Sequence, residues 1–494
     1  MRSQPFRKIL IANRGEIACR ILRTLKTSGV ASVAIHHAVE DRSPHVGQAD
    51  EAVEIFGDTP VAAHLDVEQI VAAAQGAGAD AIHPGYGFLS ENARFAAAVE
   101  AAGLVFVGPD AETIALMGDK ISARNFARAQ GVPVAPSVTP TGDLSSFLAA
   151  AETIGFPLLI KAAAGGGGKG MSVVRSASEL RSAARIAASE AERYFGDGRI
   201  YAETYVERPR HIEVQIAGDG DGQALHLYER ECSVQRRFQK IIEEAPAAAL
   251  APALRDDICA AAARLASAAH YRNLGTVEFI VAADGRFFFL EMNTRLQVEH
   301  PVTEMITGLD LVRLQLEIAA GFGLAGVPRP LPRRGHAIEC RVCAEDPERD
   351  FLPETGTLAV LEIPSAPWLR FENALAPGQR IGTEFDPMLA KLVVHGDTRE
   401  QAVERALQAL DQLALLGVRT NIDYLARVLD HPGFRAGELH TGFLQEHAAA
   451  LQPKALDAAA TDAAVIAAAL GFRNFRNVVF DVPEPYASIG AWRN

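Results

Sequence analysis

The fold of this 494-residue chain is decided by residues 276–293, which read TVEFIVAADGRFFFLEMN. Two runs in this stretch, 276–281 and 287–293, are rich in β-branched and aromatic residues and predict two strands. Between them lies Asp284-Gly285, the dipeptide typical of a two-residue type I′ turn. We therefore expect a β-hairpin at this position.

This hairpin would bring two carboxylates together. If Asp284-Gly285 is the whole loop, counting back along both strands places Glu278 directly opposite Glu291. Like charges that face each other across two strands are destabilising. Mg²⁺ typically binds one or two carboxylates together with phosphate oxygens. The hairpin therefore predicts a magnesium site between these two side chains.

Polar side chains continue along the same face of the second strand, at every second position. The row comprises Glu291, Asn293, Arg295, Gln297 and Glu299. If the strand stays extended, carboxylates, amides and a guanidinium would line one surface. A bland solvent-exposed strand face is the alternative interpretation. The apolar run that precedes the row, and its Asn, a residue that strands use sparingly, favour a functional surface.

Composition and charge narrow the class of protein. The 48 basic and 61 acidic residues give a net charge of -13, and no basic patch indicates nucleic-acid binding. No apolar stretch reaches the roughly 20 residues that a membrane span needs. Five widely spaced Cys argue against a disulfide framework and for a reducing compartment, which we expect to be the cytoplasm. Cys340 and Cys343 have redox-like spacing, but ordinary packing in a strand is favoured.

The first ~115 residues alternate apolar runs with helical stretches, which predicts a parallel sheet covered by helices. The expected strands are 8–12, 33–36, 81–82 and 105–107, and the expected helices are 17–27, 67–77 and 92–102. Ligands bind beyond the carboxyl ends of strands in such sheets. Segments 13–16 and 83–87 follow strands, so they either line a site or form turns.

A glycine-rich segment, 165–170, lies between two strand-like runs, 158–160 and 171–174. Glycine lets backbone N–H groups approach an anion closely, and Lys161 and Lys169 add positive charge. The segment is not a P-loop, because Gly and not Ser or Thr follows the second Lys. A phosphate-covering hairpin is favoured over a flexible linker.

Later strands carry polar residues with more than one interpretation. In 210–216, His211, Glu213 and Gln215 share one face and aliphatic residues share the other. Lys240 is either a site residue or one of several cations on a loop. Arg341 lies inside an apolar strand, where it pairs with a carboxylate or reaches a cleft.

The C-terminal third has its own signals. Prolines near residue 333 mark a boundary, strands are expected at 337–342 and 388–394, and a helix is expected at 399–413. The Ala-rich stretch 448–470 predicts a helical tail. His300, which precedes a proline, is expected to be structural.

Several long blocks, in order along residues 5–446, resemble the biotin carboxylase family. The blocks are Asn13-Arg14-Gly15-Glu16-Ile17-Ala18, residues 83–92, the segment Gly165–Met171, Glu243-Glu244-Ala245-Pro246 and residues 291–300. The resemblance implies an α/β and α+β protein with three domains and a tail. These are an N-terminal parallel α/β domain (1–115), an ATP-grasp domain (116–332) with a mobile lid (about 133–206), a mixed α/β C-terminal domain (333–446), and a helical tail and linker (447–494).

The resemblance also implies roles for individual residues in ATP- and Mg²⁺-dependent carboxylation of biotin. ATP would contact Lys120, Lys161, Gly166, Gly167, Gly168, Lys169, Met171, Glu203, Thr204, Tyr205, Val206, His211 and Gln235. One or two Mg²⁺ ions would be held by Glu278, Glu291 and Asn293. Bicarbonate and biotin would contact Lys240, Arg295, Gln297, Val298, Arg341 and Tyr86. Glu299 would be the general base, and Arg295, Arg341 and Lys240 would act with it.

Two residues depart from the family pattern near the nucleotide: Phe238 stands where His is usual, and Thr204 where Lys is common. None of the six Met flanks a Lys in the Met-Lys-Met setting of biotin carriers, so biotin should be a carrier-bound substrate that is not attached to this chain.

The C-terminal segments 417–422 and 440–443 resemble the α-subunits of acyl-CoA carboxylases. The resemblance implies a separate or fused biotin carboxyl carrier, a carboxyltransferase subunit, and a homodimer or larger complex. No nucleic acid or membrane is expected as a partner. The alternatives are another ATP-grasp carboxylate ligase and a non-catalytic nucleotide-binding assembly subunit.

Overall fold

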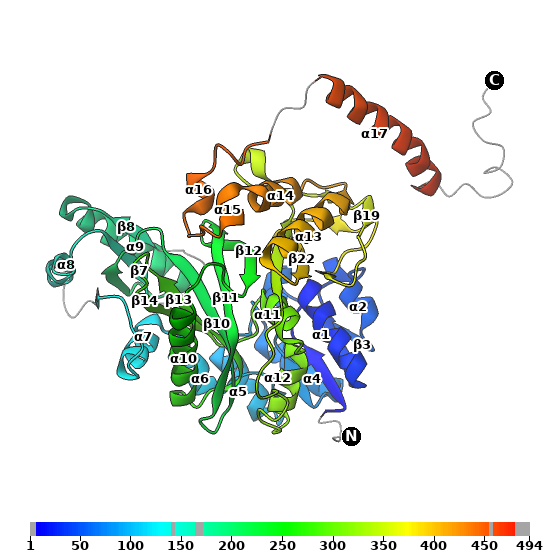
Figure 1. Cartoon of the computed structure of the whole chain (residues 1–494). Helices are drawn as coiled ribbons and strands as arrows, with labels where there is room; N and C mark the ends of the chain where they lie inside the picture. Colours follow the sequence, from blue (N-terminus) through cyan, green and yellow to red (C-terminus); the bar gives the residue numbers. More distant parts are fainter. Residues whose placement is uncertain (1–5, 140–143, 164–170, 454–457, 480–494) are drawn as a thin grey trace, which may run out of the picture. The chain divides into compact units, whose positions relative to one another are not determined.

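The structure, a computed structural model, describes residues 6–139, 144–163, 171–453 and 458–479. Its N-terminal sheet, which belongs to the blue part of the chain in Figure 1, is parallel. The strand order is β3-β2-β1-β4-β5. The strands are β1 (Lys8–Ile11), β2 (Ala31–His36), β3 (Glu51–Glu54), β4 (Ala81–His83) and β5 (Val105–Phe106). This confirms the expected parallel sheet. Strand β3 was not expected, because it is short and mostly exposed and so lacks an apolar signal.

Helices connect these strands, as the alternation predicts. They are α1 (Gly15–Ser28), α2 (Pro44–Gln48), α3 (Pro60–Ala63), α4 (Val67–Gly76), α5 (Ala93–Ala101), α6 (Ala111–Gly118) and α7 (Lys120–Ala129), with the 3₁₀ turn η1 (Ala38–Glu40). Helix α1 ends at Gly29, whose φ of 68° allows the left-handed cap. The Asp119 side chain caps α7, so Lys120 stands at the first position of that helix.

The largest sheet is antiparallel and has the order β14-β13-β10-β11-β12-β15-β22-β20. Its strands are β10 (Arg210–Asp219), β11 (Ala224–Arg236), β12 (Gln239–Ala245), β13 (Arg272–Val281), β14 (Phe287–Asn293), β15 (His336–Cys343), β20 (Leu369–Asn373) and β22 (Met388–Gly396). The last three come from beyond residue 333, so one sheet continues across the boundary that the sequence suggests.

The two faces of this sheet differ as the alternation in 210–216 predicts. Ile212, Val214 and Ile216 pack in a core with α10 (Pro252–Ala268). The opposite face carries His211 and Glu213, which belong to the site described below. The helices α11 (His300–Thr307) and α12 (Leu311–Ala319) follow β14 along the chain.

The predicted hairpin is present, but its turn and its register differ from the simple count. Ala282 pairs with Arg286, so the loop has three residues and ends at Gly285, whose φ is 83°. The two-residue loop is therefore wrong. The register then shifts between Glu278 and Phe279, where a β-bulge absorbs one extra residue of β14. Because the two deviations cancel, Glu278 still pairs with Glu291.

Residues 137–204 contribute a separate four-stranded sheet, β6-β9-β7-β8. It consists of β6 (Ser137–Val138), β7 (Leu158–Ala162), β8 (Ser172–Val174) and β9 (Ile200–Thr204), with α8 (Leu144–Glu152) and α9 (Ala177–Phe195). These elements have a core of their own, which includes Phe147, Leu158 and Leu180. Strands β7 and β8 pair antiparallel, which confirms the expected hairpin on either side of the glycine-rich segment.

The C-terminal third covers the far end of the large sheet. Helix α13 (Arg399–Gln412) and α14 (Ile422–Asp430) share a core with β15 and β22. The smaller elements are β16 (Glu345–Asp346), η2 (Pro347–Arg349), β17 (Leu352–Pro353), β18 (Gly356–Thr357), β19 (Val360–Glu362), β21 (Arg380–Ile381), β23 (Ala414–Leu416), α15 (Pro432–Ala436) and α16 (Phe443–Glu446). Cys340 and Cys343 lie in β15 as free thiols, as expected.

Residues up to Leu451 form one compact unit, and α17 (Ala458–Val479) belongs to a second. The helical tail thus begins later than the sequence suggests, since residues 447–452 form turns before Pro453. Among the described helices, none combines the length and the apolar character needed to cross a bilayer.

Candidate active site

One cavity of about 540 Å³ collects the predicted site residues from distant parts of the first compact unit. The predicted residues on its wall are Tyr86, Lys120, Lys161, Met171, Glu203, Thr204, Tyr205, Val206, His211, Gln235, Lys240, Glu278, Glu291, Asn293, Arg295, Gln297, Val298, Glu299 and Arg341. Gly166, Gly167, Gly168 and Lys169 lie outside the described residues. The structure therefore brings together every predicted site residue that it describes.

The two hairpin carboxylates are balanced by cations. Lys240 Nζ lies 2.9 Å from Glu278, and Lys120 Nζ lies 3.2 Å from Glu291. Asn293 Nδ2 donates a hydrogen bond to Glu278 Oε1 at 2.8 Å. Because Mg²⁺ prefers carboxylate and amide oxygens, these two carboxylates and the Asn293 amide form a donor set that fits this ion.

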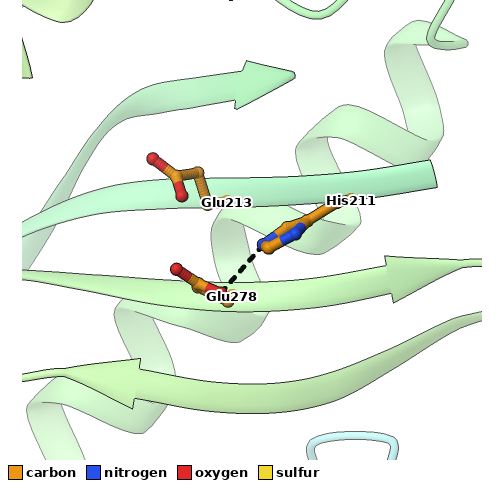
Figure 2. A group of neighbouring side chains, drawn as sticks. All are labelled: His211, Glu213 and Glu278. Atoms are coloured by element: carbon orange, nitrogen blue, oxygen red, sulfur yellow. Dashed lines mark ion pairs between the residues drawn. The ribbon is translucent and has the colours of Figure 1, made fainter. Parts of the chain in front are cut away.

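Glu278 also belongs to a cluster with His211 and Glu213. Figure 2 shows His211 and Glu213 on β10 close to Glu278 on β13, with His211 Nε2 at 2.8 Å from a Glu278 oxygen. The three side chains could bind a metal by spacing alone. However, Lys240 Nζ lies 2.5 Å from Glu213, and the buried Arg230 guanidinium pairs with the same carboxylate. Glu213 therefore already has two cationic partners, and we assign it no metal.

Glu299 is the most enclosed carboxylate of the cavity, with an exposed side-chain fraction of 0%. Its oxygens lie 2.6 Å from Lys240 Nζ and 3.0 Å from an Arg341 nitrogen. Burial alone would raise its pKa, but the charges of Lys240, Arg341 and Arg230 outweigh burial and hold the pKa well below its usual range. Glu299 is therefore ionised at neutral pH and can accept a proton.

Arg341 is held on β15 by a second carboxylate. Its guanidinium contacts Glu243 at 2.5 Å in addition to Glu299. Burial raises the pKa of Glu243 to about 7, against the opposing charge of Arg341. The pairing answers the question that the sequence left open, because Arg341 both pairs with carboxylates and reaches the cavity.

The polar row after β14 reaches the cavity without staying extended. The strand ends at Asn293, and residues 298–299 form a turn before α11. Arg295 nevertheless donates to Gln297 Oε1 at 2.8 Å and pairs with Glu91 at 2.8 Å. Gln297 Nε2 in turn lies 3.2 Å from Glu278 Oε1. The prediction assumed that the strand stays extended, which is wrong, but the side chains still converge on the cavity.

The other end of the cavity is built around Glu203 on β9. Lys161 Nζ lies 3.0 Å and an Arg124 nitrogen 2.6 Å from its carboxylate. Burial would raise the Glu203 pKa, and the charges of Lys161 and Arg124 lower it below its usual range. Thr204, at the end of β9, lines the same wall and places an uncharged hydroxyl where the family commonly has Lys.

Phe238 lies in the tight turn between β11 and β12. Arg237 and Phe238 have φ values of 49° and 66°, which non-glycine residues adopt at a cost in energy. The Phe238 side chain is 55% exposed and lines the cavity. The departure from the family pattern therefore lies at the rim of the site.

Four residues of the site carried no role in the sequence reading. They are Glu91, Arg124, Glu213 and Glu243, and each one pairs with a predicted site residue or its partner. Glu213 had a local signal, since it shares a strand face with His211, and Glu91 and Glu243 lie in the blocks that resemble the family. Arg124, Glu91 and Glu243 meet their partners through chain folding over many residues, which no local pattern records.

Tyr86 connects this cavity to a second one of about 870 Å³. The second cavity is lined by the loops after β1, β2 and β4, at the carboxyl ends of the parallel sheet, and by residues between 374 and 389. Residues 13–16 and, from the segment 83–87, Tyr86 and Gly87 thus line this cavity, which lies where ligands bind in parallel sheets. The Tyr86 hydroxyl has no hydrogen-bond partner among the described residues.

Comparisons with known proteins agree with this geometry. Three family models match in succession: the biotin carboxylase N-terminal domain (residues 5–114), the ATP-binding domain of the carbamoyl-phosphate synthase L chain (residues 119–327) and the biotin carboxylase C-terminal domain (residues 339–446).

Individual relatives cover most of the chain. A biotin carboxylase from Halalkalibacterium halodurans is 49% identical over 90% of this chain and 98% of its own length. The α-subunit of mouse mitochondrial methylcrotonoyl-CoA carboxylase is 46% identical, but the chain spans only 62% of its length.

A solved structure has the same fold. The biotin carboxylase domain of Hydrogenobacter thermophilus 2-oxoglutarate carboxylase, a dimer with MgADP, ADP and bicarbonate, has a TM-score of 0.88. It is 42% identical, and the match covers 91% of this chain and 99% of that one. This chain belongs to the biotin carboxylase family of ATP-dependent ligases.

Proposed function

We propose that the chain uses ATP to activate bicarbonate and transfers the resulting CO₂ unit to biotin on a carrier. The observation that carries this proposal is the environment of Glu299. This buried, ionised carboxylate lies between Lys240 and Arg341, on the same cavity as the Glu278–Glu291 pair. A base, two cations and a metal-binding carboxylate pair are what bicarbonate activation needs.

ATP would occupy the end of the cavity around Glu203. Lys120 and Lys161, with the glycine-rich segment, would meet the phosphates, and the backbone of 203–206 would border the base. Met171, His211 and Gln235 line the same region. Glu278, Glu291 and Asn293 would hold one or two Mg²⁺ ions, which neutralise charge on the phosphates when bound.

The first step would form a bond between bicarbonate and the γ-phosphorus of ATP. Arg295, Gln297, the Val298 backbone and Lys240 would hold bicarbonate. Glu299 would remove its proton, a bicarbonate oxygen would attack the phosphorus, and ADP would leave. Since phosphoryl transfer depends mainly on positioning and charge neutralisation, this set of donors suits the step.

The second step would release CO₂ from carboxyphosphate beside biotin. The phosphate that leaves would accept the biotin N–H proton, and the nitrogen would attack CO₂. Arg341 would stabilise the negative charge on the ureido oxygen, and Tyr86 would line the biotin pocket. Closure of the lid, about residues 133–206, would exclude water from the reactive intermediate.

The proposed partners follow from the same resemblance. They are a biotin carboxyl carrier and a carboxyltransferase, in a homodimer or a larger complex within an acyl-CoA carboxylase. We also propose a cytoplasmic location and the division into residues 1–115, 116–332, 333–446 and 447–494. An intact mass equal to the unmodified 52.8 kDa chain would support a separate carrier.

The test is ATP cleavage by the purified chain with Mg²⁺, with and without bicarbonate and free biotin. We expect turnover that requires bicarbonate and increases with biotin. In Glu299→Gln it should fall by about 100-fold or more, the usual effect of losing a general base. Turnover independent of bicarbonate, or full activity of Glu299→Gln, would instead favour another ATP-grasp carboxylate ligase.

A further inference from the structure

Two fully buried side chains hold the turn that carries Glu299, residues 297–299, by hydrogen bonds to its backbone carbonyls. His300 Nδ1 lies 2.8 Å from the Gln297 carbonyl oxygen, and Lys391 Nζ donates to the Val298 carbonyl at 2.8 Å. The exposed fraction is 0% for both His300 and Lys391. Each of the two peptide groups that flank Val298 is thus held at its carbonyl end.

The chemistry of His300 fixes its protonation. A carbonyl oxygen can only accept, so Nδ1 must carry the hydrogen in this contact. Burial, together with the nearby charges of Lys391, Arg20 and Arg370, holds the His300 pKa well below its usual range. The ring is therefore neutral, with its single N–H hydrogen directed at the Gln297 carbonyl.

Lys391 joins the turn to two other parts of the fold. It extends from β22, and its ammonium lies 3.2 Å from a Glu16 oxygen on α1 and 5.7 Å from the centre of the Tyr86 ring. One cation therefore links helix α1, strand β22 and the 297–299 turn.

Holding a carbonyl also orients the N–H of the same peptide group. In a planar trans peptide the C=O and N–H bonds point in opposite directions. Because His300 holds the Gln297 carbonyl, the Val298 N–H must point to the other side of the turn. Val298 lines the same cavity as Lys240 and Glu299, and no described residue accepts a hydrogen bond from its N–H. A half-buried donor without a protein partner is available to a ligand.

We propose that His300 and Lys391 are positioning residues that preset the Val298 N–H as a donor to bicarbonate and fix the approach of the Glu299 carboxylate. This inference rests on the proposed function, which supplies bicarbonate as the ligand. It adds a positioning role to the structural role expected for His300. Neither side chain lines the cavity of about 540 Å³, so both would act through the 297–299 turn.

The test compares variants that remove a donor with one that keeps it. His300→Leu removes the N–H at similar size, whereas His300→Asn can place an amide N–H near the position of Nδ1. Lys391→Met removes the ammonium and keeps the length of the side chain. For each full-length variant the measurements are kcat and KM for bicarbonate in biotin-stimulated ATP cleavage, and the Kd for MgADP.

We expect kcat/KM for bicarbonate to fall about 10- to 100-fold in His300→Leu and Lys391→Met, in the range seen when one oriented donor is lost. MgADP binding should stay within about 3-fold, and His300→Asn should recover most of the activity. If His300→Leu does not fold, Lys391→Met decides the question.

Parental kinetics in both donor-removing variants would overturn the inference and leave the proposed function intact. A parallel loss of MgADP binding would also overturn it, since the effect would then be general disruption. An unsubstituted chain that shows no bicarbonate-dependent cleavage would refute the proposed function itself, whatever the variants do.

Discussion

Glu203 and Glu299 are two buried carboxylates with depressed pKa values and the same physical cause. Each lies between two cations, Lys161 and Arg124 for the first and Lys240 and Arg341 for the second. A buried carboxylate is costly unless such partners compensate for lost hydration. The two carboxylates lie at different ends of the cavity, Glu203 at the proposed nucleotide end and Glu299 at the proposed bicarbonate site.

Glu203→Gln should lower the stability of the ligand-free protein. The change leaves two cations with exposed side-chain fractions of 3% and 4% near each other without a counter-charge. Breaking such a buried pair costs about 3 kcal/mol or more in the free energy of unfolding. Chemical denaturation measures this loss, and MgATP should restore more stability to the variant than to the parent.

The matched control is Glu207→Gln, whose pair with Arg175 is exposed by more than 60% on both sides. It should change stability by less than about 0.5 kcal/mol. Equal effects of the two substitutions would show that burial of the Glu203 group does not matter.

At the residue scale the sequence predicted the polar row well, because period-two spacing is a local signal. Glu291, Asn293 and Glu299 could be recognised in this way, whereas Glu278 was found by counting across the hairpin. Arg124 and Glu91 could not, since they come from helical or loop segments that meet the row only after the chain folds. Their partners lie 79 and 204 positions away in the sequence, as Arg124 to Glu203 and Glu91 to Arg295.

At the scale of elements, the hairpin β13–β14 shows how a correct pairing can arise from a wrong turn. The three-residue loop shifts the register by one, and the bulge shifts it back. A turn dipeptide constrains only the residues near it, and no feature of the sequence predicted the bulge. The predicted pairing of Glu278 with Glu291 was therefore correct, but only because the bulge, which the sequence did not predict, offsets the longer loop.

Gly285→Ala should destabilise the protein through this loop. Gly285 has a φ of 83°, and a Cβ there would meet no atom within 4 Å, so the cost is conformational and not steric. A loss of about 1 kcal/mol or slightly more in unfolding free energy is expected.

Gly76→Ala is the comparison for that loop substitution. Gly76 ends α4 with an ordinary φ and equally free space, so alanine should be neutral or slightly stabilising there. The prediction is contradicted if denaturation ranks the two substitutions in the opposite order.

Helix α1 and strand β22 meet at the buried pair Glu16 and Lys391. Burial, opposed by Lys391, raises the pKa of Glu16 to about 7. A raised folded-state pKa gives stability that is present below the unfolded value and lost as pH rises through the folded one. From pH 4.5 to about 7 the parent should therefore lose stability relative to Glu16→Gln.

The relative loss should reach about 3 kcal/mol by pH 8, following the conversion of a pKa shift to free energy. Denaturation of both proteins at pH 5, 6.5 and 8 measures it. Glu68→Gln removes the same charge from an exposed position on α4 and is the control, which should change the free energy of unfolding by less than about 0.5 kcal/mol at each pH. A pH-independent difference for Glu16→Gln would exclude this role of burial.

At the scale of the whole molecule, the large sheet joins segments that the sequence divides. Strands β15, β20 and β22 extend the sheet of β10 to β14, so the C-terminal third contributes Arg341 and Lys391 directly to the site. A proline-rich boundary signals a change of segment, and it carries no information on whether strands beyond it pair with earlier ones. Domain limits read from such signals stay predictions.

The tail behaves differently, because α17 belongs to a separate compact unit from residues up to Leu451. Chain termination after Pro453 should change the thermal unfolding midpoint by less than about 2 °C, because the removed segment lies outside the main core. Biotin-stimulated ATP cleavage should stay within about 2-fold of the parent. A large loss of either property would indicate that the tail completes the enzyme.

In the proposed reaction a bicarbonate oxygen attacks the γ-phosphorus of ATP, and Glu299 acts as the base. The origin of this oxygen can be measured with ¹⁸O-labelled bicarbonate, by analysis of the phosphate released during biotin-stimulated turnover. Since the attacking oxygen stays on phosphorus, one ¹⁸O atom should appear in each phosphate, and Glu299→Gln should release almost none of this labelled product. If the new oxygen on phosphate came from water, then water and not bicarbonate would attack the phosphorus, and the proposed reaction would be wrong.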